Sequence, residues 1–293
     1  MNLINYLAFI KVCELGNITK AAKELGYSQP GVSHMLEALE EDMGFPLLIR
    51  NKSTITPTED GKRILPYCYQ IIKSDADMHQ TADAINGLLD GKIRISSFNS
   101  MLVNFTPKVI REFTNIYSNI EISIQEGAFS EIIDDLQNNV IDIGFISRFE
   151  EKGLEFLPLF DDPVCLIMSE NHPFAAYDTV PIEALNGCDF IMSVPGWDDL
   201  VIMVQQKKRF SPNIKHYLAS DTGAISMVAE NLGVYILSKI QSSLLPDNVV
   251  IKEFSENVYR TLGIGIRSSG SLTPSLKKFI LMSQELAKPL KKA

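Results

Sequence analysis

Apolar side chains recur at helical spacing through the first 43 residues of the chain and predict three short helices. The first covers residues 3–15. The second covers residues 17–26 and has small side chains on one face, which allow another helix to cross it closely. The third begins after Ser28, a typical N-cap residue, and carries Pro30 in its first turn, where a missing N–H group costs nothing.

A hairpin and a long helix are expected next. Residues 47–50 and 53–56 are β-prone, flank a polar tip and predict a small wing beside the three helices. Residues 58–89 predict a long helix whose apolar side chains repeat at near-heptad spacing. The main positions of this seam are Ile64, Ile71, Met78 and Ile85. An exposed seam needs a partner, so we expect homodimerisation through the long helix; packing against the rest of the same chain is the alternative.

From residue 91 onward, short β-branched runs alternate with helical patterns. The expected strands lie near residues 93–95, 120–124, 141–146, 164–168, 190–192 and 235–237. The helices expected between several of them cover residues 105–115, 130–138 and 223–231. This alternation is typical of βαβ units and predicts an α/β domain with largely parallel sheets, in two segments of similar character that form two lobes.

The length of 293 residues is enough for more than one domain. The composition, with 45% hydrophobic and 22% charged residues, is that of a folded chain. The N-terminal stretch lacks a basic segment and carries Lys11 and Glu14 among its apolar residues, which argues against a signal peptide or membrane span. We therefore expect a cytoplasmic chain with no membrane partner. The net charge of −9 disfavours nonspecific coating of nucleic acids, so any such binding must come from one local surface.

Residues with catalytic or metal-binding chemistry are scattered along the chain. Cys13, Cys68, Cys165 and Cys188 form no CxxC pair and have no histidine at ligand spacing, so we expect reduced thiols and neither a zinc site nor a disulfide framework. The four histidines are dispersed, and neither a GxSxG motif nor a Walker loop occurs. We expect no catalytic residue, no metal and no cofactor, and hence no enzyme.

The segment AAKELGYSQPGVSH, residues 21–34, resembles the helix-turn-helix signature of LysR-type transcriptional regulators. Further landmarks of that family follow in order over nearly the whole chain: Leu39, Glu40, Gly44, Leu47, Arg50, Thr58, Gly61, Gly91 to Ile95, Pro107, Phe113, Gly127, Leu136, Asp142 to Gly144, His172 to Ala175, Leu232 and Gly233. The resemblance implies an α+β two-domain chain with an N-terminal winged helix-turn-helix, a long linker helix and a C-terminal two-lobed α/β domain like a periplasmic binding protein. The corresponding ranges are 1–61 for the DNA-binding domain, 62–90 for the linker and dimerisation helix, and 91–293 for the effector-binding regulatory domain, with lobe I at about 91–161 and 267–293 and lobe II at about 162–266.

The same resemblance implies a function. The chain would bind double-stranded DNA at specific sequences and regulate transcription under the control of a small-molecule effector held between the lobes. By family analogy it would form a homodimer through the linker helix and then a homotetramer, with RNA polymerase as a further candidate partner. Two alternatives stay open: a redox-sensing regulator of the same family that uses Cys165 and Cys188, and a non-exported solute-binding protein.

The third helix is the candidate for reading DNA, because the first turns of a helix in the major groove reach base edges while the preceding helix crosses the backbone. We expect Gln29 to pair with adenine, and Ser33 and His34 to contact bases or phosphates. The whole expected DNA-contacting set is Thr19, Lys20, Ser28, Gln29, Pro30, Ser33, His34, Arg50 and Lys52. For each of them the alternative is a solvated polar side chain, and for Pro30 a simple helix starter.

The charge of this part of the chain limits its affinity for phosphates. Residues 1–60 carry five basic and eight acidic side chains, a formal charge of −3, and Ser53 and Thr54 stand where the family's wing often has arginines. We expect Lys20 to touch phosphate, and Arg50 and Lys52 to reach phosphate or the minor groove. Nonspecific affinity should be weak and its salt dependence modest.

Ligands of α/β domains bind beyond the carboxyl ends of strands, near helix N-termini, and residues 96–101 and 220–223 are polar turns of this kind. By the family resemblance, the expected effector contacts are Ser97, Asn99, Ser100, Met101, Ser147, Arg148, Ser193 and Thr222. Arg148 would pair with an effector carboxylate or, alternatively, form a salt bridge at the surface or between the lobes. Trp197 is either a wall of the pocket or a packed loop side chain. Because helix N-termini favour anions, we expect a small carboxylate as the effector.

Overall fold

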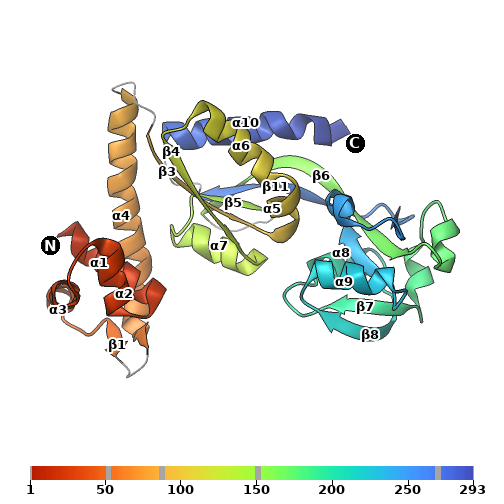
Figure 1. Cartoon of the computed structure of the whole chain (residues 1–293), viewed down its shortest axis with the longest axis horizontal. Coiled ribbons are helices and arrows are strands. Elements are labelled where there is room, and N and C mark those ends of the chain that lie inside the picture. Colours follow the sequence, from red (N-terminus) through yellow and green to blue (C-terminus); the bar gives the residue numbers. More distant parts are fainter. Residues whose placement is uncertain (1, 51–53, 86–89, 149–152, 268–271, 293) are drawn as a thin grey trace.

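The chain divides into a small helical head, one long helix and a two-lobed α/β body (Figure 1). The computed structural model describes residues 2–50, 54–85, 90–148, 153–267 and 272–292. The long helix, α4 (Glu59–Ile85), leaves the head and stands beside lobe I, and lobe II lies at the opposite end of the molecule (Figure 1).

The head consists of α1 (Leu3–Leu15), α2 (Ile18–Leu25), α3 (Gln29–Met43), β1 (Leu48–Arg50) and β2 (Ile55–Pro57). Two side chains cap its helices: Asn17 accepts a hydrogen bond from the backbone N–H of Lys20, and Ser28, as predicted, accepts one from that of Gly31. The strands pair antiparallel, which confirms the hairpin. The side chains that close the core are Phe9, Val12, Ala21, Val32, Leu36, Leu39 and Leu47.

One face of α4 is left uncovered by the described residues. Its first turns complete the head core, where Ile64 and Cys68 contact the other helices. Further along the seam, Ile71, Met78 and Ile85 are 39%, 59% and 81% exposed. Exposure of three apolar side chains on one line of a helix favours the predicted partner over packing within the same chain.

The body is built from two groups of elements. Lobe I contains β3 (Gly91–Ser97), α5 (Asn99–Asn104), α6 (Thr106–Ile116), β4 (Ile120–Glu126), α7 (Phe129–Gln137), β5 (Ile143–Ser147) and α10 (Pro274–Ala287). Lobe II contains β7 (Asp189–Ser193), α8 (Asp199–Lys207), β8 (Asn213–Leu218), α9 (Asp221–Ala229), β9 (Tyr235–Ser238) and β10 (Val249–Glu253). The long strands β6 (Leu154–Ser169) and β11 (Tyr259–Arg267) lie between the two groups, and β6 contributes side chains to both cores.

The expectation of largely parallel sheets is wrong for the centre of the body. The order of the large sheet is β10-β6-β11-β5-β3-β4, with β9 also paired to β6, while β7 and β8 form a separate pair. β3 pairs parallel with β4 and β5, but every pairing of β6 and β11 among the described residues is antiparallel. The pattern of β11 is interrupted by Gly263 and Gly265, which are poor strand formers, so the sequence alone did not predict this strand. Gly263 is required there, because a Cβ atom would lie 2.4 Å from the backbone oxygen of Leu157 on β6.

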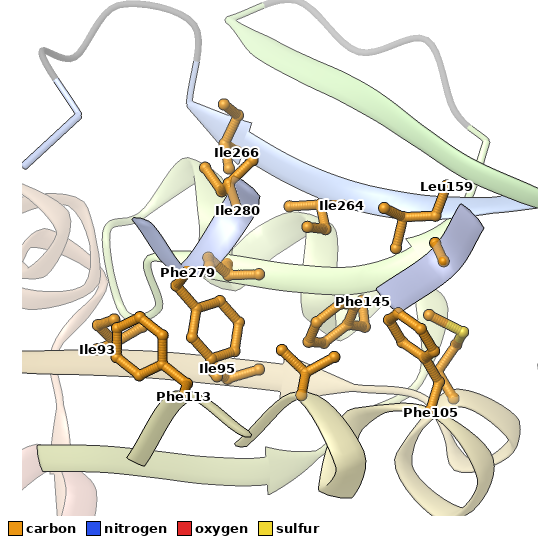
Figure 2. Packing of buried hydrophobic residues seen from close by; sticks show 14 of the residues in the cluster. Ile93, Ile95, Phe105, Phe113, Phe145, Leu159, Ile264, Ile266, Phe279 and Ile280 are labelled. Atoms are coloured by element: carbon orange, nitrogen blue, oxygen red, sulfur yellow. The ribbon is translucent and has the colours of Figure 1, made fainter. Parts of the chain in front are cut away.

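The core of lobe I is aromatic at its centre (Figure 2). Phe113 of α6 meets Phe279 of α10 edge-on, with ring centroids 5.0 Å apart, and Phe105 meets Phe145 of β5 in the same way at 5.9 Å. Edge-to-face contacts of buried rings stabilise a fold beyond the area they bury. This core fixes β3 and β5, whose carboxyl ends carry the candidate effector contacts.

A cluster of charges joins α4 to lobe I. The carboxylate of Asp142, only 7% exposed, forms ion pairs with Lys73 of α4 and Arg94 of β3. Arg94 donates from Nε and Nη2 at 3.1 and 3.0 Å, and its backbone N–H donates to the same carboxylate at 2.9 Å. Burial raises the pKa of Asp142, but the hydrogen bonds and charges of Arg94 and Lys73 outweigh burial and hold the pKa below its ordinary value. The head and its helix are therefore attached to the body through an ionised aspartate.

Replacing Asp142 with Asn should lower the free energy of unfolding by about 3 kcal/mol at neutral pH, at the low end for a broken buried pair because Lys73 and Arg94 keep some access to water. A lowered pKa in the folded state stabilises the fold above the ordinary pKa of 3.8, and this contribution is lost as the pH falls through the folded-state pKa. The difference between the two proteins should therefore shrink in acid. Urea unfolding at several pH values measures it, with the exposed Asp134→Asn as control; a difference of less than about 0.5 kcal/mol at neutral pH would contradict the assignment.

Candidate functional site

The first turns of α3 present polar side chains to solvent. Ser28, Gln29, Pro30 and His34 are exposed and Ser33 is half-buried, while the opposite face of the helix closes the head core. Gln29 Nε2 donates to Ser33 Oγ at 3.1 Å, one turn further along. This bond uses one hydrogen of Nε2 and holds the amide of Gln29 on the outer face of the helix, and the amide oxygen and the second hydrogen of Nε2 have no partner among the described residues.

The basic side chains of the head differ in whether an acidic side chain already pairs with them, and so in how available they are to bind phosphate. Thr19 and Lys20 are exposed in the first turn of α2, and the Lys20 side chain forms no ion pair with a described residue. Arg50 at the end of β1 is also exposed, but its Nη2 lies 3.8 Å from the carboxylate of Glu40. Glu40 thereby neutralises part of the charge expected on the wing. Lys52, the other expected wing contact, lies outside the described residues.

A cavity of about 230 Å³ opens between the two lobes. Of the expected effector contacts, Asn99, Ser100, Ser147, Ser193 and Thr222 line it, and so does Trp197. These side chains come from the carboxyl ends of β3, β5, β7 and β8 or from the turns that follow. The structure thus brings together residues separated by more than a hundred positions in the sequence.

Three of the expected contacts do not line this cavity. Ser97 is fully buried and shares a hydrogen bond of 3.3 Å with Thr106, and Met101 is a core residue of lobe I. Arg148 is exposed and lies over the ring of Phe156, with its guanidinium carbon 5.6 Å from the ring centroid. We therefore leave Ser97, Met101 and Arg148 out of the proposed contacts.

The cavity contains a buried arginine that the sequence did not single out. Arg260 of β11 is 5% exposed, and its Nε and Nη2 atoms donate to the Asp162 carboxylate at 3.2 and 3.1 Å. Nη2 also lies 2.7 Å from Ser100 Oγ of lobe I and 2.8 Å from Ser238 Oγ of lobe II. Arg260 therefore connects both lobes at the floor of the cavity. An arginine beside an apolar run can indicate a buried, paired arginine. The sequence gives this indication only once the run is known to be a strand.

Acidic side chains also line the cavity. Asp221 accepts hydrogen bonds of 2.7 Å from both Tyr235 Oη and Gln241 Nε2. Tyr235 Oη also lies 3.1 Å from Ser193 Oγ. Burial, and to a smaller extent the nearby Asp221, raise the pKa of Asp199, while the charge of Arg260 acts in the opposite direction. Asp199, Asp221 and Arg260 are thus close enough to influence one another.

The four cysteines lie in surroundings that disfavour the thiolate. Burial raises the pKa of Cys13 and of Cys165 to about 12 and that of Cys68 to about 11, and it also raises the pKa of Cys188. A thiol with a raised pKa is a poor nucleophile and a slow target for oxidants. No group of histidine, cysteine and carboxylate side chains suited to a metal ion occurs among the described residues. Within the same residues, no helix is long and apolar enough to cross a membrane.

A winged helix-turn-helix head joined to a two-lobed domain with a central cavity is the architecture of a DNA-binding protein that carries an effector-binding domain. Two family profiles match the chain: the bacterial regulatory helix-turn-helix protein of the LysR family over residues 5–62, and the LysR substrate binding domain over residues 86–288. The chain therefore belongs to the LysR family of DNA-binding transcriptional regulators. Proteins of this family regulate transcription and are not enzymes.

Individual relatives agree with this assignment. The chain is 29% identical over 289 residues to the uncharacterized HTH-type transcriptional regulator YvbU of Bacillus subtilis, covering 98% of this chain and 99% of the relative. Its fold resembles that of full-length OxyR from Pseudomonas aeruginosa with a TM-score of 0.80 at 22% identity, covering 98% of this chain and 95% of the other. The effector binding domain of QuiR in complex with shikimate matches with a TM-score of 0.61 at 27% identity, over 68% of this chain and 98% of that domain.

The bond between Arg260 and Asp162 can be tested by a pair of substitutions. Arg260→Met leaves the carboxylate of Asp162, 2% exposed, without its partner and should lower the free energy of unfolding by about 3–5 kcal/mol. Adding Asp162→Asn removes the unpaired charge but keeps the acceptor for the backbone N–H of Ile240, so part of the loss should be recovered. Urea unfolding followed by the fluorescence of Trp197, the single tryptophan, measures both effects.

The exposed Arg209→Met is the matched control, since it removes an arginine from the same lobe without breaking a described contact. If Arg260→Met and Arg209→Met had equal free energies of unfolding, the pair of Arg260 and Asp162 would not stabilise the fold.

Proposed function

We propose that this chain binds a specific DNA sequence as a dimer and that a small molecule held between its lobes changes this binding. The observation that carries the proposal is the accessible first turn of α3, where the Gln29 amide is held at the surface by Ser33. A glutamine amide presents one donor and one acceptor at the spacing of the adenine edge in the major groove. Ser33 and His34 extend the same surface, and Ser28 and Pro30 lie at its near end.

Phosphate contacts fix the position of the head on the duplex. Lys20 and Thr19 open α2, the helix that crosses the backbone in this class of motif, and Lys20 is the basic side chain of the proposed set with no acidic partner among described residues. Arg50 contributes less to phosphate binding, because the nearby carboxylate of Glu40 neutralises part of its charge. Few free cations and a negative head imply weak nonspecific binding, so base contacts carry a larger share of the affinity than usual. A protein that acts on the bacterial chromosome in this way works in the cytoplasm.

Gln29→Ala should weaken the free energy of binding to a DNA site selected from a random duplex pool by about 1–3 kcal/mol. It should also relax the sequence preference at one base pair. Lys20→Ala should weaken binding by a similar factor on every sequence, because phosphates carry no sequence information. Competition binding at fixed salt distinguishes the two effects. Glu37→Ala, an exposed side chain about two turns further along α3, is the control and should leave the preference at every base pair unchanged. Equal losses for Gln29→Ala on selected and random DNA would remove Gln29 from the base-reading set.

Dimerisation follows from the seam on α4. Ile71, Met78 and Ile85 are exposed on the part of the helix beyond the head core, and a second copy of the same helix is the partner that a near-heptad seam fits. Two heads held by paired helices would meet two half-sites on one face of the duplex. A homotetramer and contact with RNA polymerase are expected from the family and are part of the proposal.

Met78→Asp should shift the chain toward the monomer at micromolar concentration, because it places a charge in the middle of the apolar interface. His79→Asp is the matched control: it adds the same charge at the neighbouring position, which is 70% exposed and lies off the seam. Sedimentation equilibrium measures the mass of each. An unchanged mass for Met78→Asp, or a monomeric parent, would rule out the seam as the interface.

The small molecule is proposed to bind in the cavity between the lobes, in contact with Asn99, Ser100, Ser147, Ser193 and Thr222. Binding there changes the free energy of the arrangement of the two lobes, and lobe I is attached to the helix that bears the head. The redox alternative gains no support, because burial raises the pKa of both Cys165 and Cys188.

A further inference from the structure

The cavity between the lobes is acidic. The charged side chains that line it are Glu126, Asp199, Asp221 and Arg260. Arg260 is already neutralised by its ion pair with Asp162, which lies beneath it and is 2% exposed. The three other groups are carboxylates, so the site as a whole carries a negative charge. A ligand with no charge other than a carboxylate would be repelled by most of the wall.

None of the three carboxylates forms an ion pair with a side chain in the described part of the chain. Glu126 accepts a hydrogen bond from the Asn99 amide at 3.0 Å, and Asp221 accepts from neutral groups only. Asp199 has backbone N–H groups as its hydrogen-bond donors. Arg260 is the cation among the described lining residues and is already paired with Asp162, so a ligand that brings a further cation would stabilise these carboxylates.

Arg260 offers the opposite charge at one point of the same cavity. Its Nε and Nη2 atoms are occupied by Asp162, Ser100 and Ser238, whereas Nη1 donates to no atom of the described residues. The carbon of the guanidinium lies over the ring of Phe98, 5.0 Å from the ring centroid. This contact helps to fix the orientation of the guanidinium. An anionic group of a ligand can therefore be held at Nη1 and at Ser100, on the lobe I side of the cavity.

We propose that the ligand of this cavity is a zwitterion of the α-amino acid type, with its carboxylate at Arg260 and Ser100 and its protonated amine facing Asp199 and Asp221. The inference rests on the proposed function, because that function places the effector here. It keeps the expected carboxylate and adds the cation that the acidic wall requires. An ammonium group supplies three N–H donors, which suits two neighbouring carboxylates that have no cation of their own.

The dimensions and the remaining wall agree with this class. A cavity of about 230 Å³ holds a compound of amino-acid size. Its mouth is lined by Phe129 and Trp197, which are 38% and 46% exposed and can cover an apolar or aromatic side chain of the ligand. Ser147 and Ser193, both buried, are neutral donors and acceptors beside the charged ends.

The experiment uses the full chain and the twenty L-amino acids as probes, measured by thermal shift and then by titration calorimetry. For each amino acid that binds, three compounds with the same carbon skeleton are compared: the acid without the amine, the amine without the carboxylate, and the hydroxy acid. We expect at least one amino acid to bind and each of its three analogues to bind at least about 10-fold more weakly, because each lacks one charge-assisted contact.

Variants locate the binding. Asp199→Asn and Asp221→Asn should each weaken binding of the amino acid at least about 10-fold. The same variants should bind the acid without the amine no more weakly than the parent does, because each removes a charge that repels its carboxylate. Asp178→Asn, an exposed carboxylate of lobe II away from the cavity, is the control and should bind as the parent does. If Asp199→Asn fails to fold, Asp221→Asn keeps the test valid.

Two results would overturn the proposal that the ligand is a zwitterion. One is an acid or hydroxy acid that binds as tightly as the amino acid, and the other is the absence of binding by all twenty amino acids. The same preparation is tested for specific DNA binding by competition. If DNA recognition is intact while the amino acids fail, only the ligand class is wrong; if specific DNA binding is absent as well, the proposed function fails with it.

Discussion

The arrangement of the whole chain depends on one long helix that is fixed in its first turns and again at its middle. The first turns of α4 belong to the core of the head through Ile64 and Cys68, and its middle is held to lobe I by the ion pair of Lys73 with the buried Asp142. A helix transmits displacement because its turns are hydrogen-bonded to one another, and in α4 Pro66 removes one such bond between Ile64 and Lys73. The head therefore cannot turn relative to lobe I without bending the helix or breaking a buried charge cluster. This constraint gives a sensor domain a physical means of setting where a DNA-reading surface stands.

The second constraint lies between the lobes. β6 and β11 run side by side through the body, and the pair of Asp162 and Arg260 joins these two strands below the cavity, where Arg260 also contacts Ser100 of lobe I and Ser238 of lobe II. Separating the two partners of a buried pair is costly, because it leaves a buried charge without its counterion. A ligand in the cavity contacts both lobes around this fixed floor. Closure of the lobes around the ligand, followed by a change in the placement of paired heads, is the mechanism we propose for regulation.

Local signals in the sequence predicted the head, the wing and the long helix well, because caps, small-residue faces and a near-heptad seam each act within a few residues. The polar turns that follow β3 and β8 were also identified from their neighbours, and so were Asn99 and Thr222 at the cavity. The body was predicted less completely: the antiparallel pairing of β6 with β11 joins segments about a hundred residues apart, and glycines hide the strand pattern of β11. Arg260 was missed for this reason. Met101 was misplaced because the inward face of a short helix cannot be told from its ligand-facing side before the core is known.

The central claim is that α3 reads a specific duplex sequence and that α4 presents two copies of it. The most direct measurement is selection of bound fragments from the sheared genome of the source organism by the purified full chain, followed by footprinting of the enriched fragments. The account predicts a small number of discrete sites, each with two related half-sites on one face of the duplex, separated by a whole number of helical turns of about 10 base pairs. Recovery of fragments in proportion to their abundance, with no shared sequence, would contradict it.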